Sequence, residues 1–412
     1  MENTKIKDIN VIAGSITVPQ GFSATGDHIG IKKKRKDLTL IKSDVPATAA
    51  GVFTLNSVKA PPVLWNQQKI INNINGIVIN SGVANACTGE TGRKNTELMA
   101  QIYAECLNVS KESILVASTG VIGVQLPMEV ISQGIKNLFP KMDNAEKSSR
   151  KAAEGIMTTD KFPKEIAIET EINGKTVRFG AIAKGSGMIH PNMATMLAFV
   201  TTDADINRKL LQKCLKECVD DSFNMISVDG DTSTNDMVIA LANGQAGNSP
   251  IETEDRDYNK FKKALEYVTL YLAKQIIMDG EGVTKFLEVK VQGASTKEDA
   301  RKIAKSIINS NLVKTAMFGS DANWGRIVCA AGYSGANFDH SRADVEFSSA
   351  AGAISPLISG EPVIFDEDLA LNVLKEREIQ ILFALKDGKE EATAWGCDLT
   401  YDYVKINGEY RT

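Results

Sequence analysis

A central hairpin motif constrains the fold of this chain more than any other part of the sequence. Two runs rich in strand-forming residues, 165–172 and 175–183, are joined by Asn-Gly at 173–174, a pair typical of a two-residue β-hairpin turn. The second run leads into Gly-Ser-Gly at 185–187, and an apolar run at 196–201 predicts a buried strand. We therefore expect a hairpin that continues through a glycine-containing turn into a further core strand.

Strand and helix signals alternate along the rest of the chain. Because strands with tight turns are mixed with grouped helices, the pattern favours the α+β class, with helices layered around mixed sheets, over a strict βαβ repeat. With 412 residues the chain is long enough for two lobes. Predicted strands cover residues 76–80, 114–118, 237–241, 286–291, 379–384 and 391–406, and predicted helices cover 93–107, 127–139, 207–219, 255–278 and 296–311.

The charge balance argues against a general nucleic-acid-binding protein, because the formal net charge is -4. One basic run, Lys-Lys-Lys-Arg-Lys at residues 32–36, is interpreted as a solvated loop or strand edge, with an anion-binding patch as the alternative. No apolar run reaches the length of a membrane span, and the first residues lack an apolar signal region. A cytoplasmic protein without membrane contact is expected.

Metal-binding and disulfide patterns are weak. Of the six cysteines only Cys214 and Cys218 are close, and no further Cys or His accompanies them as a zinc site requires. The chain has only three histidines, so a His-based catalytic triad or a His-rich metal site is not favoured. Residues 229–236 resemble a calcium loop, but its sixth and twelfth positions are Thr234 and Ala240 instead of glycine and glutamate. We expect reduced thiols and no metal.

Thr195 lies between the glycine-containing turn and the predicted core strand. A threonine hydroxyl is a poor nucleophile unless a base lies beside it. Cleavage of the preceding peptide bond would supply that base as the α-amine of Thr195, whose ordinary pKa is about 7.7–8.0. The alternative is a structural threonine at the start of a strand, and the residues alone leave both open.

Five motifs along the chain resemble the ornithine acetyltransferase (glutamate N-acetyltransferase) family of arginine biosynthesis. They lie at residues 118–123, 157–160, 184–199, 279–282 and 407–412. The resemblance implies an N-terminal-nucleophile active site with Thr195 as nucleophile, made by self-cleavage between Ala194 and Thr195. It also implies two fragments, 1–194 and 195–412, with a smaller lobe formed by the C-terminal part of the second.

In this family the positions of Thr119 and Gly120 form the oxyanion hole, and Lys184 and Thr158 contact the substrate. The residue types suit these roles, since a hydroxyl and a glycine amide can point at one developing oxyanion. Each has a structural alternative: an ordinary turn after a strand for Thr119 and Gly120, an exposed lysine at the end of a hairpin for Lys184, and a helix cap for Thr158.

The resemblance places three further substrate contacts in the C-terminal half, at Glu281, Asn407 and Thr412. A carboxylate at Glu281 suits a cationic substrate amine or the threonine amine, and a solvated loop acid is the alternative. The chain end, ordinarily frayed, is expected to fold back onto the pocket. Val83 replaces the asparagine usual in the family, which puts a polar role there in doubt.

These observations predict a self-processing acyltransferase that moves an acetyl group from N2-acetyl-L-ornithine to L-glutamate. The family implies two copies of each fragment in a heterotetramer and no cofactor. Family members differ in whether acetyl-CoA is also an acetyl donor, and the residues do not decide this. The alternatives are an amidohydrolase or aminopeptidase with the same nucleophile, in which water resolves the acyl-enzyme, and a non-catalytic binding protein on the same scaffold.

Overall fold

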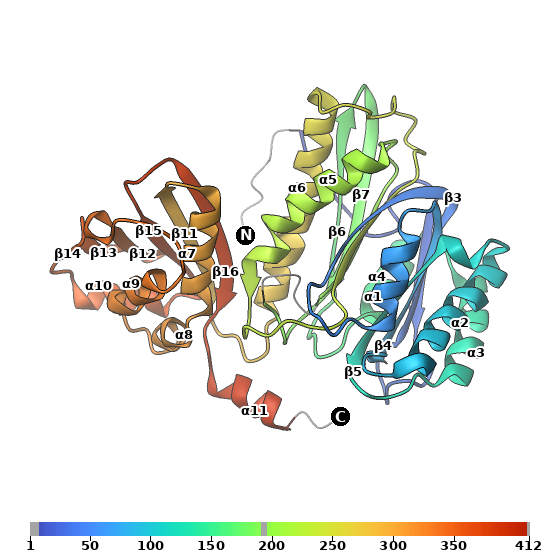
Figure 1. Cartoon of the computed structure of the whole chain (residues 1–412), viewed down its shortest axis with the longest axis horizontal. Coiled ribbons are helices and arrows are strands. Elements are labelled where there is room, and N and C mark those ends of the chain that lie inside the picture. Colours follow the sequence, from blue (N-terminus) through green and yellow to red (C-terminus); the bar gives the residue numbers. More distant parts are fainter. Residues whose placement is uncertain (1–7, 191–195, 410–412) are drawn as a thin grey trace. The chain divides into compact units, whose positions relative to one another are not determined.

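The computed structural model describes residues 8–190 and 196–409. The chain forms two compact units, each described here by itself. Among the described residues, the larger unit comprises 8–185, 196–222 and 232–276, and the smaller comprises 186–190, 223–231 and 277–409. Each contains one mixed β-sheet with helices, so the expected α+β class is confirmed (Figure 1).

In the described part of the chain, the sheet of the larger unit has nine strands. Eight of them follow the order β1-β6-β7-β8-β10-β3-β4-β5, and β2 pairs with β3. The pairs β8–β10 and β4–β5 are parallel and the others are antiparallel. The strands are β1 (Asn10–Ile12), β2 (Phe22–Asp27), β3 (Leu38–Phe53), β4 (Ile74–Val83), β5 (Ile114–Val121), β6 (Lys164–Ile172), β7 (Lys175–Lys184), β8 (Leu197–Thr202) and β10 (Met237–Ala242).

Helices cover both faces of this sheet, because the side chains of a central strand alternate between two apolar cores. In β4, Ile77 and Ile79 join the core that includes α4, whereas Val78 joins the core that includes α2 and α3. The helices are α1 (Pro61–Lys69), α2 (Gly89–Leu107), α3 (Met128–Leu138), α4 (Glu146–Gly155), α5 (Arg208–Asp220) and α6 (Arg256–Met278), whose last two residues belong to the smaller unit.

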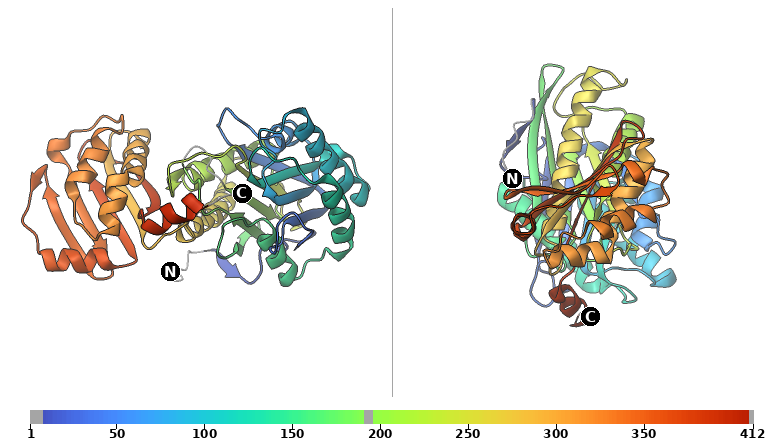
Figure 2. Two further views of the ribbon diagram at one scale, coloured as in Figure 1. Left: turned by 90° about the horizontal axis from the view of Figure 1, so that it is seen from below. Right: turned by 90° about the vertical axis from the view of Figure 1, so that its left-hand side faces the viewer.

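The sheet of the smaller unit has the order β14-β13-β12-β15-β11-β16-β9. Its inward side chains are apolar, as in the row Val289, Ile381 and Phe347, so helices gather on that face (Figure 2). Its elements are β9 (Ile226–Ser227), β11 (Phe286–Ala294), β12 (Asp344–Ser349), β13 (Gly352–Ile358), β14 (Glu361–Pro362), β15 (Glu378–Ala384), β16 (Glu390–Cys397), α7 (Lys297–Asn309), α8 (Asn311–Phe318), α9 (Trp324–Gly332), α10 (Glu367–Lys375) and α11 (Tyr401–Glu409).

Most predicted elements are present, including the hairpin of β6 and β7, whose turn residues Asn173 and Gly174 both have positive φ. The prediction of strand over residues 391–406 is wrong after Cys397. There Thr400 accepts a hydrogen bond from the Tyr403 amide and begins α11 in place of a continued strand.

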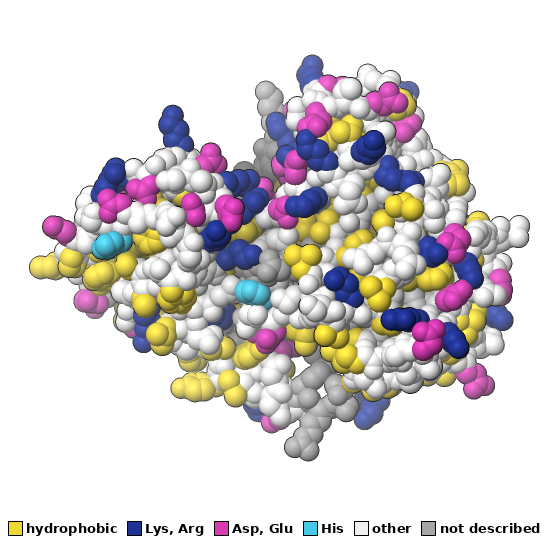
Figure 3. Space-filling model, in the orientation of Figure 1, with side chains coloured by type: hydrophobic (Ala, Val, Ile, Leu, Met, Phe, Trp, Pro, Cys, Tyr) yellow, Lys and Arg dark blue, Asp and Glu magenta, His cyan; other side chains and the backbone are white. Residues whose placement is uncertain are grey.

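The surface gives two further findings. Lysine and arginine side chains are interspersed with aspartate and glutamate over the face in Figure 3. Among the described residues, no helix has an apolar stretch of sufficient length to cross a membrane.

Candidate functional site

Thr119 and Gly120 lie inside β5, not in a turn after it, so the strand is longer than the sequence predicted. Its pairing with β4 extends to Ser81 opposite Thr119 and Gly82 opposite Gly120. Gly120 has a φ of +130°, and a Cβ atom there would lie 2.3 Å from the carbonyl carbon of Gly82. Only glycine fits this close approach of two backbones. The two candidate oxyanion-hole residues are therefore held rigidly at the end of a parallel strand pair.

Lys184 is the last residue of β7 and is buried, with 3% of its surface exposed. Its Nζ donates to Thr119 Oγ1 at 3.4 Å. The alternative of an exposed lysine at the end of the hairpin is therefore wrong. Because the Thr119 oxygen accepts from Lys184, the Thr119 hydroxyl proton remains available for donation to another group. Lys184 and Thr119, two of the candidate residues, are thus in direct contact within the larger unit.

Residues just before β10 connect to the same place. Asn235 Nδ2 donates to Ser118 O at 2.9 Å and to Ala84 O at 2.6 Å. Its neighbour Asp236 accepts a hydrogen bond from the Met196 amide through Oδ1 at 3.0 Å. Ala194 and Thr195 themselves lie outside the described residues. The first described residue after them, Met196, is therefore bound by Asp236, the direct neighbour in sequence of the Asn235 side chain that binds the strand end at Ser118.

The loop that contains Thr158 is organised by a buried carboxylate. Asp160 accepts from the Gly185 amide at 2.7 Å, from Lys164 Nζ at 2.7 Å and from the Thr158 amide at 2.9 Å. Burial opposes ionisation of Asp160, but the charges of Lys164 and Lys184 and these hydrogen bonds outweigh it and hold its pKa below the ordinary value. No described helix begins at Thr158, so the helix-cap alternative is wrong.

Replacing Lys164 with methionine is expected to destabilise the protein by about 3–5 kcal/mol, because both side chains of the Asp160–Lys164 pair are fully buried and the carboxylate would lose the cation that is hydrogen-bonded to it. Since the pKa of Asp160 is depressed, its contribution to stability is present above about pH 4 and is lost as the pH falls. Urea unfolding should show the difference at pH 7 and a smaller one in acid. Adding Asp160→Asn to the Lys164→Met variant should recover part of the lost stability, because the unpaired buried charge is removed. A Lys164→Met variant as stable as wild type at pH 7 would contradict a stabilising role of the Asp160–Lys164 pair.

The basic run at residues 32–36 is only partly a solvated loop. Lys32 Nζ donates to Met157 O at 2.8 Å, and Arg35 donates to Asp160 O at 2.7 Å and to Thr158 O at 3.0 Å. Burial lowers the pKa of Lys32 to about 8, against the opposing charge of Asp37. These two cations support the backbone of the Thr158 loop, a role that the sequence did not reveal.

Glu281 lies in the smaller unit, in the loop after α6, and is 7% exposed. Its amide donates to Ser186 O at 3.0 Å, and Ser186 Oγ donates to Asp279 O at 2.7 Å. A Cβ atom at Gly187 would lie 2.3 Å from Glu281 Oε2, so glycine makes room for the carboxylate. The alternative of a solvated loop acid is therefore wrong.

The remainder of the Glu281 loop is fixed by Asp398, which accepts from the Thr284 and Lys285 amides at 3.0 Å and from the Thr284 hydroxyl. Lys285 Nζ in turn donates to Met317 O, Ser320 Oγ and Leu374 O, which satisfies its buried ammonium. These bonds leave the loop little conformational freedom. The Glu281 carboxylate is thus presented from a rigid support.

Asn407, on α11, donates through Nδ2 to Glu281 Oε2 at 2.9 Å and to Tyr403 O at 3.1 Å. The helix is seated on the loop at Gly282, where a Cβ atom would lie 2.4 Å from the Tyr403 amide. The chain therefore folds back onto Glu281 up to residue 409. Thr412 lies outside the described residues.

The two glycines of the turn at residues 185–187 differ in conformation: Gly185 has a φ of +159°, whereas Gly187 has no positive φ and is constrained by the nearby Glu281 carboxylate. Met188, directly after the turn, is left-handed, with a φ of +58°. Asp229 stabilises this conformation by accepting from the Met188 amide at 2.7 Å and the Ile189 amide at 2.9 Å. Tyr403 Oη also donates to Asp229, at 3.2 Å. Burial raises the pKa of Asp229 against these bonds.

Asp229, the first residue of the loop that resembled a calcium site, therefore accepts hydrogen bonds from two backbone amides and from Tyr403. Among the described residues, no group of three or more His, Cys, Asp or Glu side chains is arranged to hold a metal ion. All six cysteines are free thiols.

Val83, where the family usually has asparagine, is buried in an apolar cluster, and its carbonyl accepts a hydrogen bond from Asn80 Nδ2 at 2.8 Å.

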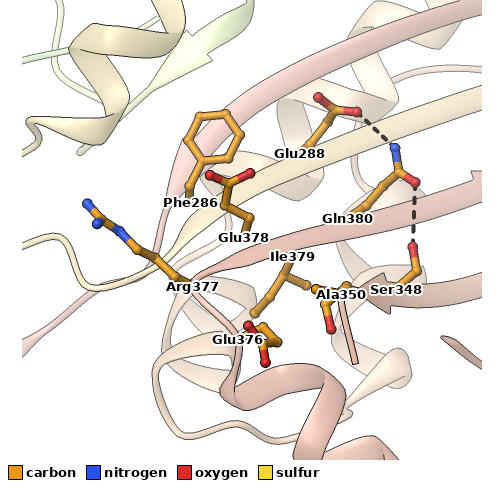
Figure 4. Close-up of a pocket in the computed structure, with 10 residues that line it drawn as sticks. Phe286, Glu288, Ser348, Ala350, Glu376, Arg377, Glu378, Ile379 and Gln380 are labelled. Atoms are coloured by element: carbon orange, nitrogen blue, oxygen red, sulfur yellow. Dashed lines mark hydrogen bonds between the residues drawn. The ribbon is translucent and has the colours of Figure 1, made fainter. Parts of the chain in front are cut away.

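A separate cavity of about 600 Å³ lies over the outer face of the smaller unit's sheet, and Figure 4 shows its lining. Gln380 donates to Glu288 at 2.8 Å, and Ser348 donates to Gln380 at 3.5 Å. Trp395 Nε1 also donates to Glu288, at 2.7 Å. None of the candidate residues lines this cavity, so we do not assign the transfer chemistry to it.

Sequence reasoning missed the residues that hold the candidates in place, namely Asp160, Asp229, Asn235, Asp236 and Asp398. The signal for Asp236 was an acid directly before a buried strand, at residues 237–241. Its importance depends on the pairing of β10 with β8, which one sequence does not reveal.

Comparison with known proteins gives the family. A model of the ArgJ family matches residues 23–412. The chain belongs to the ArgJ family. The "Arginine biosynthesis bifunctional protein ArgJ" of Thermotoga neapolitana is 55% identical over 398 residues, covering 96% of this chain and 100% of the relative. The protein of that name from Symbiobacterium thermophilum is 53% identical over 405 residues, covering 97% and 99%.

Among solved structures, the ornithine acetyltransferase of Mycobacterium tuberculosis complexed with ornithine is 36% identical, covers 44% of this chain and 98% of that chain, and has a TM-score of 0.41. The ArgJ membership confirms the family resemblance and the prediction that the chain is an enzyme of the acyltransferase class. The role of each candidate residue is a prediction that these matches leave open.

Proposed function

We propose that the chain is a glutamate N-acetyltransferase of arginine biosynthesis that moves the acetyl group of N2-acetyl-L-ornithine to L-glutamate through an acetyl-threonine at Thr195. The observation that carries the proposal is the network at the end of β5. There the Lys184–Thr119 bond, the close approach at Gly120 and the Asn235 bonds organise the candidate oxyanion hole. The match to the ArgJ family over residues 23–412 supports the reaction class.

Self-cleavage comes first in the proposal. The Thr195 hydroxyl oxygen attacks the Ala194 carbonyl carbon and forms an ester bond, the peptide C–N bond breaks, and the Thr195 nitrogen gains the hydroxyl proton. Water then hydrolyses the ester, which leaves the Ala194 carboxylate, the Thr195 hydroxyl and a free Thr195 amine. The products are fragments 1–194 and 195–412, and the proposed enzyme is a cytoplasmic heterotetramer with two copies of each.

Acetyl transfer then proceeds in two balanced steps. The Thr195 oxygen attacks the acetyl carbon of N2-acetyl-L-ornithine, its amine passes the hydroxyl proton to the leaving nitrogen, and ornithine departs. The glutamate amine attacks the acetyl ester, and one of its protons returns to the Thr195 oxygen as N-acetylglutamate leaves. Thr119 and Gly120 stabilise each tetrahedral oxyanion. We assign Thr158, Lys184, Glu281, Asn407 and Thr412 to substrate binding, with no cofactor; acetyl-CoA is an open second donor.

The test combines an intact mass under denaturing conditions with an acetyl-transfer assay. The 44.5 kDa chain should give two species in proportion to 194 and 218 of 412 residues, about 21 kDa and about 24 kDa. Acetylornithine consumption should depend on glutamate and follow ping-pong kinetics. A single uncut species refutes the mechanism. Consumption of acetylornithine that is independent of glutamate favours the amidohydrolase or aminopeptidase alternative. The same assay with acetyl-CoA in place of acetylornithine tests whether acetyl-CoA is also a donor.

Asn407→Ala is expected to raise KM for N2-acetyl-L-ornithine about 3- to 30-fold, because Glu281 loses the amide that holds its carboxylate. The side chain lies on an exposed helix, so Tm and self-cleavage should stay near those of wild type. Steady-state kinetics with varied acetylornithine measure the effect, and Lys405→Ala on the same helix is the matched control. An unchanged KM would remove Asn407 from the proposed binding set.

A further inference from the structure

Lys32 belongs to the loop between β2 and β3, which is fixed to the strand end that carries Thr119. Asp37 accepts a hydrogen bond from the Ile29 amide at 2.7 Å through Oδ1 and one from the Lys32 amide at 2.8 Å through Oδ2. The carbonyl oxygen of Asp37 accepts from the Ser81 amide at 2.9 Å, and Ser81 lies opposite Thr119 in the pairing of β4 with β5. The backbone of Lys32 is therefore held in place against the end of β4.

The Lys32 side chain joins this strand end to the Thr158 loop. Its stem lies on Gly82, where a Cβ atom would come within 2.9 Å of Lys32 Cγ. Gly82 is the residue opposite Gly120, at the close backbone approach that organises the candidate oxyanion hole. At the other end of the side chain, Nζ donates to Met157 O at 2.8 Å, directly before Thr158 in sequence. One side chain of the larger unit thus contacts both the strand end assigned to oxyanion stabilisation and the loop assigned to substrate binding.

The ammonium of Lys32 binds a carbonyl that the neighbouring cation does not reach. Arg35 donates to the carbonyls of Thr158 and Asp160, whereas Lys32 donates to that of Met157. In the described part of the chain, Met157 O is the one hydrogen-bond acceptor of the Lys32 ammonium, and the residue is half-buried. A hydrogen bond from a charged donor is about twice as strong as one from a neutral donor. The hold on the Met157 carbonyl therefore depends on the charge of Lys32.

This charge is lost at a lower pH than in an ordinary lysine. Burial lowers the pKa of Lys32 to about 8. The charges of Asp37 and Asp160 oppose the shift, and those of Arg35 and Lys184 add to it. Lys32 is therefore charged at neutral pH and becomes neutral in the mildly alkaline range, in which an ordinary lysine keeps its charge.

We propose that Lys32 is a positioning residue for acetyl transfer, whose ammonium holds the Thr158 loop in register with the Thr119–Gly120 end of β5. The inference rests on the proposed function, which gives those residues their roles. Lys32 lies outside the five motifs of the family resemblance, and it acts through the backbone that it contacts, without taking part in bond making. Because both half-reactions use the same oxyanion hole, its loss should slow each of them.

The test compares wild type with Lys32→Met, which keeps the apolar stem and removes the donor. The ratio of wild-type to variant kcat/KM for N2-acetyl-L-ornithine should be about tenfold at pH 7 and below about threefold at about pH 9.5, where wild-type Lys32 has lost its charge. A purely structural role of the stem would give a ratio that does not change with pH. Lys32→Arg should restore most of the activity and move the alkaline limb upward by at least about one pH unit, because arginine stays charged. Lys34→Met, at an exposed position of the same loop, is the matched control and should behave as wild type.

Equal kcat/KM values for wild type and Lys32→Met at pH 7 overturn the inference, and so does a ratio that is constant with pH. If the variants do not fold or stay uncut, the wild-type pH profile decides. Its kcat/KM should decline above about pH 8, a direction opposite to the gain expected when the nucleophile's own amine becomes neutral. A wild-type profile without a decline up to about pH 10 overturns the inference. Uncut wild-type protein, or consumption of acetylornithine that is independent of glutamate, would instead refute the proposed function.

Discussion

Thr195→Ala should remain a single species of 44.5 kDa and lose acetyl transfer by more than about 10³-fold. The variant lacks the hydroxyl that attacks the Ala194 carbonyl, so no amine is released and no acetyl ester can form. Both losses follow from one missing oxygen. Denaturing mass spectrometry and the glutamate-dependent assay measure them on the same preparation.

Thr195→Ser is the matched control for this prediction. Serine retains the hydroxyl and loses only a methyl group, so it should give both fragments and measurable transfer. Substantial transfer by an uncut Thr195→Ala protein would contradict the mechanism. A cut Thr195→Ala protein would show that another residue or a contaminating protease breaks the chain.

The sequence predicted the strands and the central hairpin well because those signals are local. Alternation and the Asn-Gly pair at 173–174 identify β6 and β7 without knowledge of their partners. Thr119 and Gly120 were placed after the strand because glycine ordinarily ends one. The opposing Gly82 makes Gly120 compatible with continued pairing, and that contact joins residues far apart in sequence.

Side-chain roles were predictable only where the motifs of a family marked them. Lys184 had two open interpretations because burial is a tertiary property. The structure excludes the exposed lysine, since Lys184 is buried against Thr119, and substrate binding stays a prediction. Asp229 and Asp236 begin and end one loop, and their carboxylates hold backbone amides at Met188 and Met196, on either side in sequence of the expected cleavage bond. Composition and spacing give no hint of which amide a loop aspartate will bind.

Gly120→Ala should reduce kcat for acetyl transfer by at least about 10²-fold and destabilise the protein by about 2–5 kcal/mol. The new methyl group would lie 2.3 Å from the carbonyl carbon of Gly82, and a φ of +130° is strained for alanine. Relief of that clash must move β5 away from β4, which displaces the Gly120 amide and the neighbouring Thr119 hydroxyl from the position at which an oxyanion forms. Urea unfolding, intact mass and kcat should be measured together, since the self-cleavage step also forms a tetrahedral oxyanion.

Gly123→Ala separates backbone strain from the proposed catalytic effect. Gly123 also has a positive φ, +82°, but a Cβ atom there meets nothing within 4 Å. This control should cost about 1–2 kcal/mol of stability and leave kcat within about twofold of wild type. If Gly120→Ala folds, is cut and retains wild-type kcat, the oxyanion hole does not lie at Thr119 and Gly120. If both variants lose activity equally, general loosening of this strand end, and not displaced donors, explains the loss.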